Sequence, residues 1–264
     1  MLAIDIGGTK VRFGSNPHEP SGWLQTPEST NDLLEICAEI IGSSNQIVCI
    51  ACPGVIDGEG YVEVSFLKSI NSINLTTAIE KYTKSSVFVL NDVQAQALGV
   101  DGDGTLAYYG FGTRAGGAFV DRNHPRRERR KNEGEFGHTA CGITGTEICE
   151  CGASDCLDLF TAGFRLEQRY GEWWNSTERT LQVSKFVSTP IASSVRSVMV
   201  TLAPDHLAIG GHLAGHAAIR NEINIALSKT IWRPPQLDFY SNTWHLMYEG
   251  CRRFIGTKTN META

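Results

Sequence analysis

The sequence lacks a long uninterrupted hydrophobic run, because polar and charged residues divide its apolar stretches throughout the 264 positions. A membrane-crossing helix needs about 20 consecutive apolar residues, so no contact with a membrane is expected. The sequence also lacks a basic excess, since 23 lysines and arginines stand against 29 aspartates and glutamates. This mild acidity argues against nucleic acid as a main partner.

The N-terminus lacks the charged leader and hydrophobic segment of a secreted protein, because an apolar strand begins at Leu2 and Gly7 follows almost at once. A disulfide framework is lacking too, since three of the eight cysteines lie in one short segment and the other five are scattered. Both absences predict a cytoplasmic protein. A chain of this length can bury a core in one large or two modest domains.

What the sequence does contain is a segment rich in metal-binding side chains, between residues 134 and 158. It carries one histidine and three cysteines, namely His138, Cys149, Cys151 and Cys156. One imidazole and three thiolates suit a closed tetrahedral zinc site, and that zinc would be structural because no ligand position stays open. The alternative is a flexible loop in which the cysteines are incidental.

Two carboxylates in the same segment are not needed by a metal. Glu135 lies three residues before His138, and Asp158 lies two residues after Cys156. A metal that pins both ends of the loop would hold these carboxylates rigidly, as a polyol-binding pocket requires. The alternative is that both are solvent-exposed acids.

The rest of the chain predicts an α/β protein in which strands and helices alternate. In the first half, strands are expected at 2–6, 11–14, 46–51 and 87–90. Helices are expected at 75–82, from 94 to 98, and up to residue 41 from a cap at Thr30, Asn31 or Asp32. Strands at 106–109 and 118–121 then repeat the opening hairpin around a glycine-rich stretch at 110–117. Later elements are a helix that includes 191–202, a strand at 207–211 and a helix at 243–256.

The repeated hairpin predicts two related α/β domains that face each other across a cleft. The residues Gly8, Thr9 and Lys10 of the first hairpin have a counterpart in Gly112, Thr113 and Arg114. We expect one domain at 1–100 and a second at 101–264, joined near the glycine-rich stretch 99–104. As an alternative for the last helix, it packs back on the first domain.

Three glycine pairs or runs follow predicted strands, at 7–8, 112–117 and 210–211. Glycine lets backbone N–H groups approach phosphate oxygens closely, and such turns form anion-binding nests. A tight hairpin needs glycine in any case. Three such turns at strand ends nevertheless favour a nucleotide-binding cleft.

Asp92 is the candidate general base, because a carboxylate at the end of a strand can accept the proton of a hydroxyl group that attacks a phosphate. Asn91 could hydrogen-bond a neighbouring hydroxyl group. The alternative is that this pair caps the helix that follows, a common role for both residue types. On this pair alone, the cap is favoured.

These motifs together resemble the ROK family of sugar kinases and sugar-responsive repressors, over nearly the whole chain. The matching motifs are residues 5–10, 53–54, 91–92, 134–138, the cysteine run 149–156 and the stretch from 204 to 211. The resemblance implies an actin-like, ribonuclease-H-like two-domain ATPase fold with a structural zinc loop, which closes over a hexose and Mg²⁺-bound ATP.

The resemblance also implies roles for individual residues. Asp92 would be the catalytic base. The substrate would contact Asn91, Glu135, His138, Asp158 and Gly54. ATP and Mg²⁺ would be held by Asp5, Gly7, Gly8, Thr9, Lys10, Gly112, Thr113, Gly116, Gly117, Gly210 and Gly211.

The sequence departs from the family pattern at three single positions, and the sugar-contacting Asn-Leu that the family usually has is not recognisable in the region 65–71. Arg114 stands where the second phosphate turn usually has glycine, and it either adds a phosphate contact or blocks the approach of the backbone. Asp158 stands where the family usually has glutamate, so its reach is shorter by one methylene group. Asp155 replaces the last glycine of the cysteine run.

The predicted activity is an ATP-dependent hexose kinase that phosphorylates the 6-hydroxyl group of glucose, with N-acetylglucosamine and N-acetylmannosamine as alternative substrates. A second hypothesis is a catalytically weak, sugar-binding regulator of the same family without a DNA-binding domain, since the hairpin begins at Leu2. The choice between ATP and polyphosphate as donor stays open. A homodimer is expected.

Two further features favour structural roles. The basic run 126–131 is more typical of a solvated loop than of a site for an anionic partner. Trp173 and Trp174 favour packing or a dimer contact over stacking on a sugar, because they lie outside the motifs of the cleft.

Overall fold

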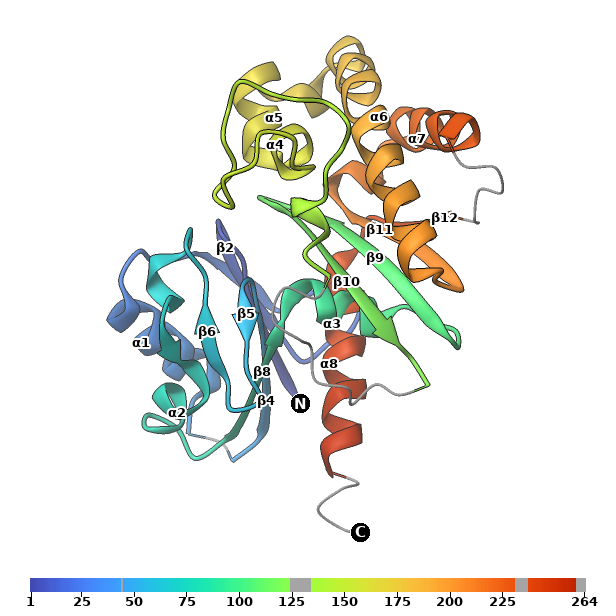
Figure 1. The fold of residues 1–264 in the computed structure, drawn as a ribbon. Helices are drawn as coiled ribbons and strands as arrows, with labels where there is room; N and C mark the ends of the chain where they lie inside the picture. The colour runs from blue at the N-terminus through green and yellow to red at the C-terminus, as the bar shows by residue number, and fades with distance from the viewer. Residues whose placement is uncertain (44, 124–133, 231–236, 260–264) are drawn as a thin grey trace. The chain divides into compact units, whose positions relative to one another are not determined.

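The computed structural model describes residues 1–43, 45–123, 134–230 and 237–259, so the basic run 126–131 lies outside the described residues. These residues divide into two compact units (Figure 1). Unit 1 holds residues 1–102 and the chain from 244 onward, and unit 2 holds residues 103–123 and 134–243. None of the described helices combines the length and the hydropathy needed to cross a membrane.

Unit 1 is built on a five-stranded sheet with the strand order β3-β2-β1-β4-β8. Its strands are β1 (Leu2–Ile6), β2 (Lys10–Gly14), β3 (Gly22–Gln25), β4 (Ile47–Cys52) and β8 (Ser86–Asn91). β1 runs antiparallel to β2 and parallel to β4, and β4 runs parallel to β8. Every residue of β1 is buried, as expected of a central strand covered on both faces.

The helices of unit 1 follow local capping signals. In α1 (Thr30–Ile41), the side chain of Ser29 accepts from the Asp32 N–H, and Gly42 ends the helix at a positive φ. Its buried face contributes to the core of the unit. The other elements are β5 (Val55–Ile56), β6 (Tyr61–Glu63), η1 (Lys68–Ile70), β7 (Ile73–Asn74), α2 (Leu75–Glu80), α3 (Asp92–Gly99) and α8 (Thr243–Thr259).

The last helix, α8, packs closely against α3 because both helices carry glycine at the contact. A Cβ atom on Gly99 would collide with the backbone of Leu246, and one on Gly250 would collide with the backbone of Ala95. The start of α8 is also attached to the chain after β2, since Trp244 donates its indole N–H to the Asn16 carbonyl oxygen at 2.9 Å. The helix at the C-terminal end therefore completes unit 1.

Unit 2 repeats the strand arrangement of unit 1, with the order β10-β9-β11-β12. Its strands are β9 (Thr105–Phe111), β10 (Ala115–Asp121), β11 (His206–Gly211) and β12 (Leu237–Tyr240). β9 and β10 form the antiparallel hairpin, and β11 runs parallel to both β9 and β12. The predicted repetition of the opening hairpin is confirmed.

The helices of unit 2 pack around this sheet, and α6 and α7 lie side by side (Figure 1). Its other elements are η2 (Phe136–His138), α4 (Asp158–Thr161), α5 (Gly163–Tyr170), η3 (Trp173–Asn175), α6 (Thr177–Leu202), η4 (His212–Gly215) and α7 (Ala217–Thr230). Trp173 is fully buried in the core of this unit, whereas Trp174 stays partly exposed. Trp173 thus serves packing.

Two element boundaries differ from the sequence-based expectation. The glycine-rich turn is shorter than predicted, because β9 continues to Phe111 and β10 starts at Ala115; Gly116 and Gly117 therefore lie in a strand. The helix expected around 191–202 starts earlier, at Thr177, and contains Pro190. Because proline usually breaks a helix, the sequence on the two sides of Pro190 does not indicate a single continuous helix. Strands β3, β5, β6, β7 and β12 and helix α7 were not predicted.

Candidate functional site

In unit 1, the candidate residues gather where the parallel strands β1, β4 and β8 end. The register places Asp5 opposite Ala51 and Cys52 opposite Asn91, so the carboxyl ends of the three strands meet at one edge. Burial raises the pKa of the Cys52 thiol well above its usual value, and the charges of Asp92 and Asp5 add to the rise. Both carboxylates therefore lie close to this thiol.

Asn91 caps α3, as one of the two sequence-based hypotheses proposed. Its side-chain oxygen accepts from the Gln94 N–H at 2.9 Å, and its amide nitrogen donates to the Gly54 carbonyl oxygen at 3.0 Å. Asp92 follows in the first turn of the helix, half-buried, and one carboxylate oxygen accepts from the Val93 N–H at 2.8 Å. The helix cap and the candidate base are thus different residues.

Asp5 is paired with Arg12, which the sequence analysis overlooked. The two residues lie directly opposite each other in the β1–β2 hairpin, and Arg12 Nε donates to Asp5 Oδ2 at 2.8 Å. A hairpin register derived from the turn would have indicated this pair. The first glycine turn, residues 7–9, is closed by a hydrogen bond from the Gly7 N–H to the Lys10 carbonyl oxygen. The Lys10 ammonium lies over the Trp23 ring, 4.3 Å from its centroid.

In unit 2, the second glycine turn, residues 112–114, lies beside the third, residues 210–211, because β9 and β11 run in parallel. Gly211 is opposite Phe111, and it needs to be glycine, since its φ is 98° and a Cβ atom would collide with the Phe111 backbone. His212 Nδ1 donates to the Phe111 carbonyl oxygen at 2.7 Å. This bond joins the two turns.

Gly117, which the sequence assigned to the second turn together with Gly116, packs against another element. Gly117 lies in β10 beneath Phe136, and a Cβ atom at this position would overlap the ring. Gly137 likewise lets η2 approach the Ala115 backbone. The packing of η2 on β10 explains both glycines. The second turn itself is supported by α5, because Gly163 donates its N–H to the Gly112 carbonyl oxygen at 3.0 Å.

We expect His212 to make the folded protein sensitive to acid. Burial lowers its pKa from 6.5 to about 4, and the nearby His216, whose own pKa is lowered by burial, acts in the same direction. A histidine with a depressed pKa stabilises the fold above pH 6.5, and that contribution, on the order of 3 kcal/mol, is lost as the pH falls toward 4. Urea unfolding at stepped pH values measures the loss.

The matched variants for this prediction are His212→Asn, which keeps a donor for the Phe111 carbonyl oxygen, and His206→Asn, which changes an exposed histidine at the start of β11. His212→Asn should flatten the fall in unfolding free energy between pH 6.5 and 4, while His206→Asn should not. An unchanged pH dependence in His212→Asn would show that another group causes the acid sensitivity.

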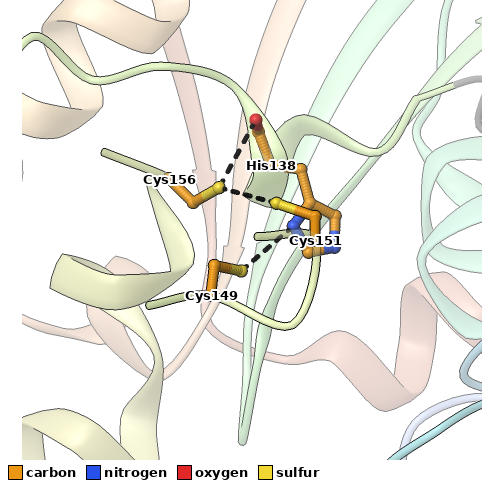
Figure 2. A group of neighbouring side chains, drawn as sticks. All are labelled: His138, Cys149, Cys151 and Cys156. Carbon is orange, nitrogen blue, oxygen red and sulfur yellow. Dashed lines mark hydrogen bonds between the residues drawn. The ribbon is translucent and has the colours of Figure 1, made fainter. Parts of the chain in front are cut away.

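The predicted metal ligands come together in unit 2 (Figure 2). One potential ligand atom from each of His138, Cys149, Cys151 and Cys156 lies within 4.8 Å of the other three. His138 Nδ1 is 3.3 Å from the Cys149 sulfur, and the sulfurs of Cys151 and Cys156 are 3.2 Å apart. Four N and S donors this close match the size and donor preference of a tetrahedral zinc site, with Zn–S distances of about 2.3 Å.

Local backbone structure explains how residues far apart in sequence reach one point. Residues 139–141 pair with residues 155–157, so that Cys156 lies opposite Ala140, and its sulfur lies 3.7 Å from the His138 carbonyl oxygen. Between them, Cys149 donates its N–H to the Ala153 carbonyl oxygen, and Gly152 reverses the chain at a φ of 91°. The cysteine loop, residues 147–156, is therefore folded as a compact turn.

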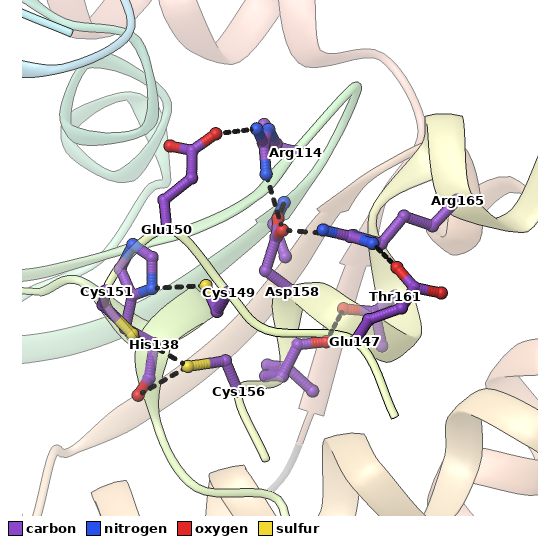
Figure 3. Close-up of polar contacts among 12 residues, drawn as sticks. Arg114, His138, Glu147, Cys149, Glu150, Cys151, Cys156, Asp158, Thr161 and Arg165 are labelled. Carbon is purple, nitrogen blue, oxygen red and sulfur yellow. Dashed lines mark hydrogen bonds and ion pairs between the residues drawn. The ribbon is translucent and has the colours of Figure 1, made fainter. Parts of the chain in front are cut away.

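Asp158 is buried in an ion-pair network, which excludes the alternative of an exposed loop acid (Figure 3). Its Oδ1 accepts from the Ala115 N–H at 2.8 Å, and its Oδ2 accepts from Arg114 at 3.0 Å. Arg165 lies 3.8 Å from the same oxygen. Arg114 also pairs with Glu150 of the cysteine loop. The sequence analysis left two roles open for Arg114, a phosphate contact or an obstruction, and missed this ion pairing.

Of the other predicted sugar contacts, Glu135 and His138 belong to unit 2, and His138 is itself one of the four candidate metal ligands. Glu135 precedes η2 and is half-buried, and His138 ends the same turn, so the two side chains belong to one short segment. Because His138 Nδ1 faces the Cys149 sulfur, the ring's other nitrogen, Nε2, is the one that a sugar hydroxyl would meet.

Comparison with known proteins reveals one family and several relatives. The model of the ROK family matches residues 1–239. A kanosamine kinase from Amycolatopsis mediterranei is 27% identical over 249 residues, which cover 81% of this chain and 80% of the relative. An N-acetylmannosamine kinase from Escherichia coli is 28% identical over 178 residues, which cover 61% of each chain.

Among solved structures, a ROK family glucokinase from Streptomyces griseus in complex with glucose and AMPPNP superposes with a TM-score of 0.76 at 17% identity. The match covers 96% of this chain and 98% of that chain. At this identity the similarity establishes the fold.

Proposed function

The chain belongs to the ROK family, and from this membership we propose that it is an ATP-dependent kinase of the 6-hydroxyl group of a hexose or N-acetylhexosamine. The fold is the actin-like, ribonuclease-H-like α/β ATPase fold that the sequence predicts, with the hairpin and parallel strands present in both units. Two relatives named as sugar kinases support the reaction class.

The observation that carries the proposal is the position of Asp92 directly after β8, next to the Asn91 cap, at the same edge of the sheet as Asp5 near the end of β1. Phosphoryl transfer depends mainly on positioning and on charge stabilisation, but a hydroxyl nucleophile must also lose its proton. Asp92 is the carboxylate that accepts this proton in our proposal. Asn91, fixed through both ends of its amide, supports the loop at Gly54 where the sugar would lie.

We assign the remaining sugar contacts to Glu135 and His138. Asp158 is left out, because its carboxylate already accepts from Ala115 and Arg114 in a buried environment. Its role in our proposal is to hold the second glycine turn in place.

The phosphates of ATP are assigned to the first, second and third glycine turns, where exposed backbone N–H groups can meet oxygens. Asp5, a hard oxygen ligand, would position the Mg²⁺ that accompanies ATP. Arg12 holds this carboxylate in place through their ion pair. Zinc at the histidine and three cysteines would be structural, and it supplies rigidity to the loop rather than chemistry.

A coupled assay across a hexose panel tests the proposed function. The panel contains glucose, N-acetylglucosamine, N-acetylmannosamine, mannose and kanosamine, each with ATP or polyphosphate as donor. We expect ATP-dependent turnover of at least one sugar. Sugar binding without turnover with either donor would instead support the catalytically weak, sugar-binding regulator.

A further inference from the structure

An ion-pair network connects the cysteine loop to the second glycine turn through Arg114. One guanidinium nitrogen donates to Asp158 at 3.0 Å, and another pairs with Glu150 (Figure 3). Asp158 also accepts from the N–H of Ala115, the residue after the turn. Asp158 thus holds both the Arg114 side chain and the backbone that follows the turn, and Glu150 holds the Arg114 side chain from the cysteine loop.

The burial of the network makes these contacts energetically relevant. The Asp158 side chain is 3% exposed and that of Arg114 is 23% exposed, so water competes little for this pair, whereas the Glu150 side chain is 44% exposed and its pair with Arg114 is the weaker of the two. Removing the partner of a buried ion costs much more free energy than removing the partner of an exposed ion, because the buried charge is left uncompensated. Moving Arg114 away from Asp158 costs free energy. The position of the Arg114 side chain therefore sets the position of the turn that contains it.

On the loop side, Glu150 stands between two of the candidate metal ligands, Cys149 and Cys151. A metal that binds both sulfurs fixes the backbone of Glu150 and hence the carboxylate that faces Arg114. Without the metal, the loop keeps its ion pairs and its backbone hydrogen bonds, such as the one from the Cys149 N–H to the Ala153 carbonyl oxygen, but the two sulfurs on either side of Glu150 are no longer fixed to one point. The partner of Arg114 then becomes less well ordered.

The same loop makes a second connection, to α5, which reaches the turn only indirectly, because Arg165 Nε lies 3.8 Å from Asp158 Oδ2. Glu147 pairs with Arg165 of α5, and Arg169 lies 3.9 Å from the same carboxylate group. The guanidinium groups of Arg114 and Arg165 each lie 4.9 Å from the centroid of the Phe164 ring. Glu147 therefore offers a control within the loop for any effect of Glu150.

We propose that Arg114 is a positioning residue that, through Glu150, couples metal binding in the cysteine loop to nucleotide binding at the second glycine turn. The inference rests on the proposed function in one respect, namely that this turn meets the phosphates of ATP. An occupied metal site orders Glu150, Glu150 and Asp158 orient Arg114, and the turn is held in its binding geometry. Coupling between two binding sites is reciprocal, so nucleotide should also tighten metal binding.

The test compares AMPPNP affinity, measured by calorimetry, in four zinc-loaded proteins: wild type, Arg114→Ala, Glu150→Gln and the double variant. Each single variant should weaken AMPPNP binding by roughly 5-fold or more, the lower range of typical couplings. The double variant should be no weaker than either single one, because both changes break one chain of contacts. Glu147→Gln, which removes the same charge from the same loop, should stay within about 2-fold of wild type.

A second readout does not depend on activity. Zinc affinity is measured by competition with the chelator 4-(2-pyridylazo)resorcinol, with and without AMPPNP. In wild type, AMPPNP should raise the zinc affinity by the same factor by which zinc raises the AMPPNP affinity. In Arg114→Ala and Glu150→Gln this factor should fall toward one. In turnover assays both variants should raise the KM for ATP and leave kcat and the KM for sugar nearly unchanged.

The outcomes separate this inference from the proposed function. If Arg114→Ala weakens AMPPNP binding and Glu150→Gln does not, Arg114 meets the phosphates directly and the coupling is overturned. Equal zinc affinity with and without AMPPNP in wild type would also overturn it. Coupling without turnover of any sugar would support the inference and contradict the proposed kinase. A wild-type protein that does not bind AMPPNP would overturn both.

Discussion

Asp92→Asn is expected to lower kcat by roughly 10²–10⁴-fold, the usual effect of a lost general base. The amide keeps the shape of the carboxylate and its hydrogen bond to the Val93 N–H, but it cannot accept the proton of the attacking hydroxyl group. Sugar affinity should change little, because the substitution removes an interaction needed only in the transition state. kcat is measured in the coupled assay, and sugar binding by tryptophan fluorescence or calorimetry.

The matched control for this variant is Asp32→Asn. Asp32 and Asp92 both lie in the first turn of a helix, so the two substitutions remove the same charge from the same kind of position. Similar small losses of stability are expected in both proteins, and only Asp92→Asn should lose turnover. Wild-type turnover in Asp92→Asn would mean that the base lies elsewhere.

Cys151→Ser is expected to abolish zinc binding and, with it, most of the affinity for sugar. A serine hydroxyl is a poor substitute for a thiolate at a tetrahedral zinc, and three remaining ligands leave the loop open. Elemental analysis should find one zinc per chain in the wild type and close to none in the variant. Because our proposal has His138 hold zinc through Nδ1, which faces the Cys149 sulfur, and sugar through Nε2, sugar affinity should fall before the overall fold is lost.

Cys141→Ser serves as the control for the zinc prediction. Cys141 lies in the same region of unit 2 and is buried, but it does not belong to the group of four ligands. This variant should retain zinc and sugar binding even if its stability is lower. A metal-free wild-type protein with normal activity would contradict the zinc assignment as a whole.

Much of the fold could be predicted because its signals are local. The buried run of β1, the serine cap of α1 and the glycine that ends that helix each act within a few residues. The repetition of a strand, a glycine turn and a second strand was visible for the same reason, and both sheets confirm it. The short strands β5–β7 were missed because a strand of two or three residues carries too few positions for a periodic pattern. Helix α7 was missed although Ile219, Ile223 and Leu227 recur every four residues on its buried face.

The candidate site was predictable where one segment holds all its residues. His138 and the three cysteines lie within 19 positions of one another, and their spacing indicated the cluster that the structure brings together. The roles assigned to Asp92, Glu135 and the glycine turns stay predictions, as do the homodimer and the domain limits at residue 100.

The sequence by itself determined the element types, the repeated halves and the composition of the metal cluster, since these depend on neighbouring residues. Only the tertiary structure decided the partners of the charged and polar side chains. Arg114 is 36 positions from Glu150 and 44 from Asp158, and His212 is 101 positions from Phe111. A residue type specifies charge and reach, but sheet register and loop path decide which distant group lies within that reach. For that reason an arginine that the sequence left between two roles proved to be an ion-pair partner in unit 2.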